Sequence, residues 1–80
     1  MQRAQVLELL RNKAVELLEL EPDQLGEDVA FASDLHVDSL ALVEFTMAIE
    51  DALAISLPEK DVVDVETLGQ FADLVVRKTA

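Results

Sequence analysis

The apolar residues between Gln2 and Leu20 recur at helical spacing. Val6, Leu10 and Leu17 mark an apolar face on which residues repeat every three or four positions, and charged residues occupy the other faces. Pro22 follows closely, and the residue before a proline is biased away from helical geometry. The pattern therefore predicts a helix over residues 2–20 that ends near Leu20.

The periodicity is lost from residue 21 to residue 37, a segment that also contains Gly26. A connection of about 16 residues is long for a compact domain, and loops of that length are usually functional or disordered. Four apolar side chains argue against disorder and predict that the loop is anchored to the core: Leu25, Val29, Phe31 and Leu35.

A second helix is predicted from Asp38 to about Leu53, with Ser39 as its first internal residue. The carboxylate of Asp38 can accept from free backbone N–H groups of the first turn. Two apolar stripes follow. The first is the expected core face, formed by Leu42, Phe45, Ile49 and Ala52 or Leu53. The second is offset from it and formed by Leu40, Val43 and Met47, either as an exposed contact surface or as additional core.

The last third of the chain carries two more helix signals. Pro58 predicts the start of a helix of one or two turns. Thr67 and Gln70 have capping-box spacing, and Arg77 and Lys78 suit the negative end of a closing helix. The predicted fold class is all-α: a small bundle of three long helices plus one short helix, with a long loop between helices one and two, in a single domain of residues 1–80.

Charge narrows the range of partners. The net charge is −11, and no Lys or Arg occurs between Ala14 and Glu59. Such a surface repels nucleic acid and anionic membranes, and it attracts a partner with a basic patch. Solubility of a small apolar domain is the simpler explanation, although it does not require the exclusion of every cation.

Several function classes lack the residues they need. There is no cysteine to act as nucleophile or metal ligand, and His36 is the only histidine, so an enzyme or a metal site is not expected. The acids near Asp23 and Asp28 do not follow the EF-hand pattern. No apolar run approaches the ~20 residues of a membrane span. We expect a monomeric, cytoplasmic protein.

Ser39 is the candidate site residue. At the start of a helix its hydroxyl would lie beside unsatisfied N–H groups and a partial positive charge, a favourable place for a phosphate diester. The alternative is that Ser39 only caps the helix.

The run over residues 31–44, Phe-Ala-Ser-Asp-Leu-His-Val-Asp-Ser-Leu-Ala-Leu-Val-Glu, resembles the attachment site of acyl carrier proteins. Ile55-Ser56-Leu57-Pro58 resembles the segment before the short third helix of that family. The resemblance implies that Ser39 receives 4′-phosphopantetheine from a phosphopantetheinyl transferase that uses coenzyme A, and that the thiol of this group holds acyl groups as thioesters. His36 is a departure, because many carriers have glycine at that position, and it leaves open which transferase or partners are used.

In this family the second helix is the surface that partner enzymes read. The resemblance therefore implies docking of acyl-processing enzymes with basic patches, such as a ketosynthase, acyltransferase, reductase or ligase, on these residues: Asp38, Leu40, Val43, Glu44, Met47, Glu50 and Asp51. It also suggests that an acyl chain withdraws between helices lined by Leu42, Phe45, Ile49, Leu57, Val62, Leu68 and Phe71.

The identity of the cargo stays open. The acidic charge, the Asp34-Leu35 pair before the serine, and a chain that starts at Met1 and ends soon after the fourth helix favour a stand-alone carrier of fatty acid or polyketide biosynthesis. The alternatives are a carrier of an amino-acyl or specialised acyl group, as in a peptide synthetase or an excised synthase domain, and an acidic helical adaptor without a prosthetic group.

Overall fold

Four α-helices and one 3₁₀ turn make up the computed structural model, which describes residues 1–80. Their bounds are α1 Arg3–Leu18, η1 Pro22–Gln24, α2 Ser39–Leu53, α3 Glu59–Val62 and α4 Leu68–Thr79. The predicted all-α class, with three long helices and one short one, is confirmed. The first helix ends at Leu18 rather than near Leu20, because Glu19 already adopts a left-handed conformation with φ 56°.

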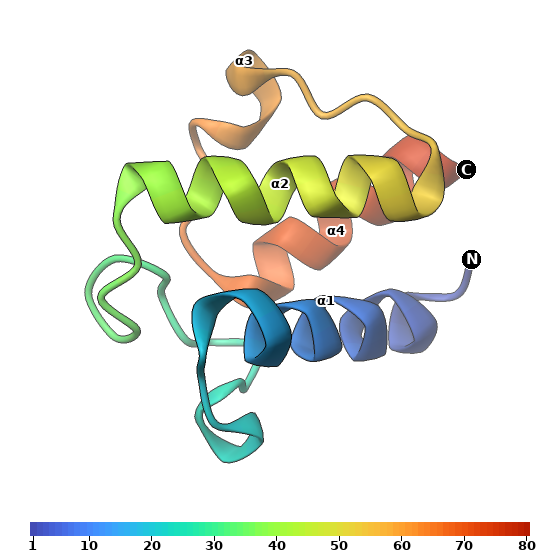
Figure 1. Ribbon diagram of the computed structural model, residues 1–80. Helices are drawn as coiled ribbons and strands as arrows, with labels where there is room; N and C mark the ends of the chain where they lie inside the picture. Colours follow the sequence, from blue (N-terminus) through green and yellow to red (C-terminus); the bar gives the residue numbers. More distant parts are fainter.

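The helices are arranged so that both ends of the chain lie far from the start of α2 (Figure 1). Helices α1 and α2 run in opposite directions, and α4 packs against α1. After α2 the chain runs back above that helix, so that α3 lies on the side of the starting half of α2 (Figure 1). None of the helices is both long and apolar enough to cross a bilayer.

Three phenylalanine rings meet at the centre of the core. Phe45 of α2 and Phe71 of α4 have ring centroids 5.3 Å apart. Phe31, from the long loop, lies 5.9 Å from the first ring and 6.1 Å from the second. Such tilted and edge-on pairs each add about 0.5–1.5 kcal/mol beyond the area they bury. The loop therefore supplies a central part of the core.

The loop between α1 and α2 is anchored, as the sequence predicted. Leu25, Phe31 and Leu35 are buried, and Val29 is half-buried. Backbone bonds join the loop to the start of α4: the Phe31 N–H donates to the Glu66 carbonyl at 2.9 Å, and the Leu68 N–H donates to the Val29 carbonyl at 3.1 Å. The loop is held by main-chain bonds as well as by side-chain burial.

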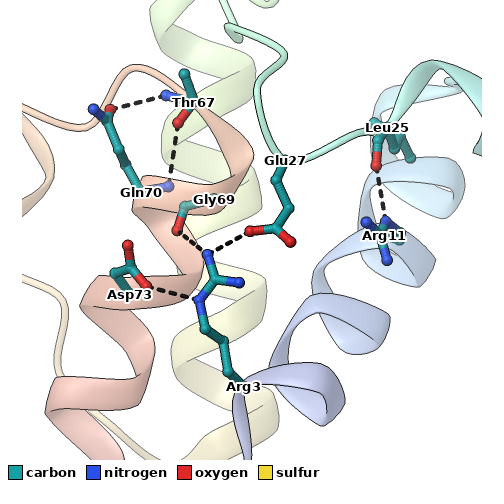
Figure 2. Close-up of polar contacts among 8 residues, drawn as sticks. All are labelled: Arg3, Arg11, Leu25, Glu27, Thr67, Gly69, Gln70 and Asp73. Atoms are coloured by element: carbon teal, nitrogen blue, oxygen red, sulfur yellow. Dashed lines mark hydrogen bonds and ion pairs between the residues drawn. The ribbon is translucent and has the colours of Figure 1, made fainter.

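Arg3 fastens the same loop to two helices (Figure 2). Its Nη2 lies 2.6 Å from Oε1 of Glu27 in the loop, and its Nε donates to Oδ1 of Asp73 in α4 at 2.8 Å. Nη2 also donates to the Gly69 carbonyl at 3.3 Å. The hydrogen bond from Arg3 lowers the pKa of the Glu27 carboxyl, and both carboxylates raise the pKa of the guanidinium.

The short helix α3 is tied to α4 by an ion pair. Nζ of Lys78 lies 2.8 Å from Oδ2 of Asp61. The hydrogen bond from Lys78 lowers the pKa of the Asp61 carboxyl. A helix of four residues has little stability of its own, so its position depends on ties of this kind.

Candidate functional site

The start of α2 is built by Asp38 and Ser39. Asp38 has extended backbone angles, and its Oδ1 accepts from the Ala41 N–H at 2.8 Å. Ser39 is the first helical residue, as predicted, and it is exposed. The cap is therefore Asp38, and Ser39 has no capping role.

The hydroxyl of Ser39 is free of protein partners. No side-chain hydrogen bond involves it, and the backbone N–H groups of Ser39 and Leu40 have no protein acceptor. Both N–H groups belong to the positive end of α2, where an anion is stabilised. The site combines an accessible oxygen with local positive potential.

The loop that leads into this site is tightly turned. Leu35 is buried, and the Val37 N–H donates to the Phe31 carbonyl at 2.8 Å. His36 between them is exposed and adopts φ 55°, a left-handed conformation that favours glycine. Glycine adopts this conformation without strain, whereas His36 adopts it at an energetic cost.

The second apolar stripe of α2 is exposed. The exposed fractions are 69% for Leu40, 53% for Val43 and 56% for Met47, so these side chains are not core. Among the acids assigned to the same surface, Asp38, Glu44 and Asp51 are exposed.

Glu50 differs from the other acids because it is half-buried and engaged. Its Oε2 accepts from the backbone N–H of Leu57 at 2.8 Å, across the loop that leads to α3. Sequence periodicity placed Glu50 beside Met47 and could not reveal this bond, because the partner is the main chain of a returning loop.

Two hollows flank Ser39. The first, about 410 Å³ between α2 and α3, is lined mainly by apolar side chains: Ser39, Leu42, Val43, Thr46, Met47, Glu50, Leu57, Glu59, Val62, Val63 and Val65. The second, about 560 Å³, lies on the loop side: Ala30, Phe31, Ala32, Ser33, Val37, Asp38, Ser39, Leu42, Val65 and Glu66.

The α2–α3 hollow differs from the predicted cargo space. Leu42, Leu57 and Val62 line it as expected. Four other predicted lining residues, Phe45, Ile49, Leu68 and Phe71, are fully buried in the core. Their helical phase was assigned correctly to the apolar side of each helix, but the phenylalanine cluster fills that space and leaves the hollow nearer the surface.

The sequence of this chain is similar to those of known proteins. The family model described as "Phosphopantetheine attachment site" matches residues 8–75. An acyl carrier protein of Caulobacter vibrioides is 33% identical over 75 residues, covering 94% of this chain and 96% of the relative. One of Guillardia theta is 34% identical over 80 residues, covering 100% and 99%. The chain belongs to the acyl carrier protein family.

The solved structures agree. The structure of an acyl carrier protein from Enterococcus faecalis superposes with a TM-score of 0.80 at 27% identity, covering 98% of this chain and 99% of that one. Acyl carrier proteins are carriers rather than enzymes, and their prosthetic group is 4′-phosphopantetheine. Membership implies interaction with a phosphopantetheinyl transferase and with acyl-processing enzymes.

The residues at the start of α2 fit this group chemically. Forming a phosphodiester requires an accessible hydroxyl, and Ser39 is exposed and makes no side-chain hydrogen bond to the protein. Free N–H groups of Ser39 and Leu40 face the added negative charge favourably. The two hollows beside Ser39 are lined mainly by apolar residues.

Proposed function

We propose that this acyl carrier protein bears 4′-phosphopantetheine on Oγ of Ser39 and shuttles acyl groups between enzymes of fatty acid or polyketide biosynthesis. The observation that carries the proposal is an exposed, unbonded serine hydroxyl at the positive end of α2. When bound, the group supplies a terminal thiol that holds acyl cargo as a thioester. The chain itself supplies a rigid attachment point at the start of α2, an apolar hollow for the cargo and a docking surface.

The assignment to fatty acid or polyketide biosynthesis is supported by the acidic charge of −11 and by the Asp34-Leu35 pair before Ser39. A carrier of amino-acyl or specialised acyl groups remains the alternative. Residues 1–80 as one domain, a monomeric state and a cytoplasmic location stay predictions from the sequence.

The cargo is proposed to bind in the hollow between α2 and α3. Its walls are formed by Leu42, Leu57 and Val62 together with the exposed Val63. Burying an acyl chain there would remove apolar area from water at about 25 cal/mol per Å². Ser39 lies at the edge of this hollow, so cargo attached there could enter it.

Partner enzymes are proposed to dock on α2. Leu40, Val43 and Met47 present apolar surface, and Met47 adapts to different partners because its thioether chain is flexible. The acids around them, Asp38, Glu44, Glu50 and Asp51, complement a basic patch and accelerate encounter. The surrounding charges favour fast association, and the small number of apolar contacts favours fast release. A shuttle requires both.

Intact-mass spectrometry tests the attachment site. The protein is incubated with coenzyme A and a broad-specificity phosphopantetheinyl transferase. We expect wild type to gain the mass of one phosphopantetheinyl group and Ser39→Ala to gain none. Ser33→Ala and Ser56→Ala are matched controls, because both serines are exposed and should leave the modification intact. An unmodified wild type, or a modified Ser39→Ala, would falsify the proposal.

Association kinetics test the docking surface. Glu44→Lys and Asp51→Lys should slow association with a basic partner such as the transferase, and the wild-type rate should fall with salt, because exposed charges are screened over about 8–10 Å. Glu8→Lys is the control, since it makes the same charge change on the exposed face of α1. Equal rates for all three variants would place docking elsewhere.

A further inference from the structure

Thr46 carries the one polar side chain among the buried residues of this protein. It is only 7% exposed, yet it lines the hollow between α2 and α3 together with Leu42, which lies one turn earlier on the same helix. A buried polar oxygen is unfavourable unless it is hydrogen-bonded. Valine has nearly the same shape and would bring no polar atom to this position. The oxygen of Thr46 is therefore an exception in a wall that is otherwise mainly apolar.

The hydroxyl of Thr46 uses its proton but not its lone pairs. Its Oγ1 donates to the backbone carbonyl of Leu42 at 2.8 Å, and no N–H or O–H group of the protein donates to Oγ1. A hydroxyl offers one proton and two acceptor lone pairs, so the bond to Leu42 satisfies only the donor half of the group. The acceptor half is free on the side of the hollow.

The other polar side chains that line this hollow are acceptors as well. Glu50 accepts through Oε2 from the Leu57 N–H at 2.8 Å, and Glu59 is an exposed residue at the start of α3. A carboxylate has no proton to donate. The hydroxyl of Ser39 loses its proton when the oxygen is esterified. Loaded protein therefore presents acceptor oxygens and apolar carbon in this hollow, and no side-chain donor.

Cargo that complements such a hollow combines apolar carbon with a hydrogen-bond donor. A saturated acyl chain would cover Oγ1 of Thr46 with methylene groups and leave its lone pairs without a partner, which is unfavourable. A hydroxyl on the chain would donate to the same oxygen. Sites that hydrogen-bond a hydroxyl of their ligand discriminate against the analogue that lacks it.

We infer that Thr46 determines cargo specificity and that the cargo of this carrier is a hydroxylated acyl chain, whose O–H donates to Oγ1 of Thr46 in the hollow between α2 and α3. The inference rests on the proposed function for the attachment of cargo to Ser39. It adds the chemical class of the cargo and the residue that recognises it.

The first test compares hydroxylated and saturated cargo in loaded protein. The transferase loads wild type and Thr46→Val from octanoyl-, 3-hydroxyoctanoyl- and 7-hydroxyoctanoyl-coenzyme A, and thioester cleavage by hydroxylamine is followed by intact mass. Protection is the cleavage rate of the matching coenzyme A thioester divided by that of the loaded protein, which removes the intrinsic reactivity of each cargo. For at least one hydroxyl position, the ratio of hydroxylated to saturated protection should be about two- to tenfold higher in wild type than in Thr46→Val, as for one neutral hydrogen bond.

Three further variants control this comparison. Thr46→Ser keeps the oxygen and should keep the wild-type ratio, whereas Thr46→Ala should lose it, and this pair gives the answer if Thr46→Val does not fold. Thr79→Val is the matched control, because Oγ1 of Thr79 also donates to a carbonyl of its own helix, that of Val76 at 3.3 Å, and Thr79 does not line the hollow. The inference is overturned if wild type and Thr46→Val give equal ratios, or if Thr79→Val lowers the ratio as much as Thr46→Val does.

The second test requires no attachment to Ser39. Unmodified wild type and Thr46→Val are titrated with octanoyl-pantetheine and its 3-hydroxy and 7-hydroxy analogues, and binding is followed by NMR at hollow residues such as Val62. For at least one analogue, the affinity relative to octanoyl-pantetheine should be about two- to tenfold higher in wild type than in Thr46→Val. Failure to load wild type in the first test contradicts the proposed function, and this titration then tests the inference alone. Equal relative affinities in the two proteins, or no binding in the hollow, overturn the inference.

Discussion

The left-handed turn at His36 provides the sharpest test of the energetics around the site. His36 has φ 55°, is exposed and makes no side-chain hydrogen bond. For an L-residue this conformation costs about 1–2 kcal/mol, and glycine avoids that cost. Glycine also loses more entropy on folding, by roughly 0.5–1 kcal/mol. The difference predicts that His36→Gly raises the free energy of unfolding by about 0.5–1 kcal/mol.

Urea unfolding of the unmodified protein, followed by far-UV circular dichroism, measures this change. For a domain of this size the urea m-value is about 1 kcal/mol per M, so the midpoint should rise by about 0.5–1 M at constant m. The thermal midpoint should rise by about 2–8 °C. An unchanged m-value is needed for the shift to be interpreted as stability.

Two controls separate backbone strain from loss of the side chain. His36→Ala keeps the strained conformation and should be no more stable than wild type. Ser56→Gly introduces glycine at an exposed loop position outside the left-handed region, and it should lower stability. The reasoning is refuted if His36→Gly is no more stable than wild type, or if Ser56→Gly gains as much.

Three further changes test other contacts. Gly69→Ala should lower the free energy of unfolding by about 1–2 kcal/mol in chemical unfolding, because its Cβ would lie 3.0 Å from the backbone oxygen of Glu27. Gly26→Ala is the control and should be neutral or stabilising, since nothing lies within 4 Å of its Cβ. If both variants change stability equally, the close contact between Gly69 and Glu27 is contradicted. Glu27→Gln should be less stable than wild type at neutral pH, because Arg3 lowers the pKa of Glu27 and the ion pair adds stability above the unfolded pKa. In urea unfolding the difference between the two proteins should shrink as the pH falls below the unfolded pKa and vanish below the lowered folded pKa, and a difference that does not shrink with falling pH would exclude the ion pair as its cause. Asp38→Ala should lower the free energy of unfolding by about 0.5–2 kcal/mol through loss of the helix cap, whereas Asp38→Asn should keep most of the wild-type stability. If Asp38→Ala is as stable as wild type in thermal unfolding, the cap bond contributes nothing.

Local signals in the sequence were sufficient for the helices. Asp38 and Thr67 mark two helix starts because capping chemistry depends on residues three positions apart. The apolar periodicity of α2 separated its two faces, and the exposure of Leu40, Val43 and Met47 agrees with that separation.

Contacts between segments that are distant in the chain have no sequence signal comparable to capping spacing or apolar periodicity. The bridge between Ala30 and Thr67, the Arg3 contacts with Glu27 and Asp73, and the bond from Leu57 to Glu50 all depend on how loops return to helices. Neither spacing nor composition encodes such a return. For the same reason the cargo hollow was assigned too deep, among core residues such as Phe45.

The position of the chain ends has a practical consequence. Both termini lie at the end of the bundle away from the start of α2 (Figure 1), which is where Ser39 is found. A purification tag or fluorescent label fused at either terminus, or a biosensor chip that captures the protein through one, should leave residue 39 facing the bulk solution and accessible to enzymes.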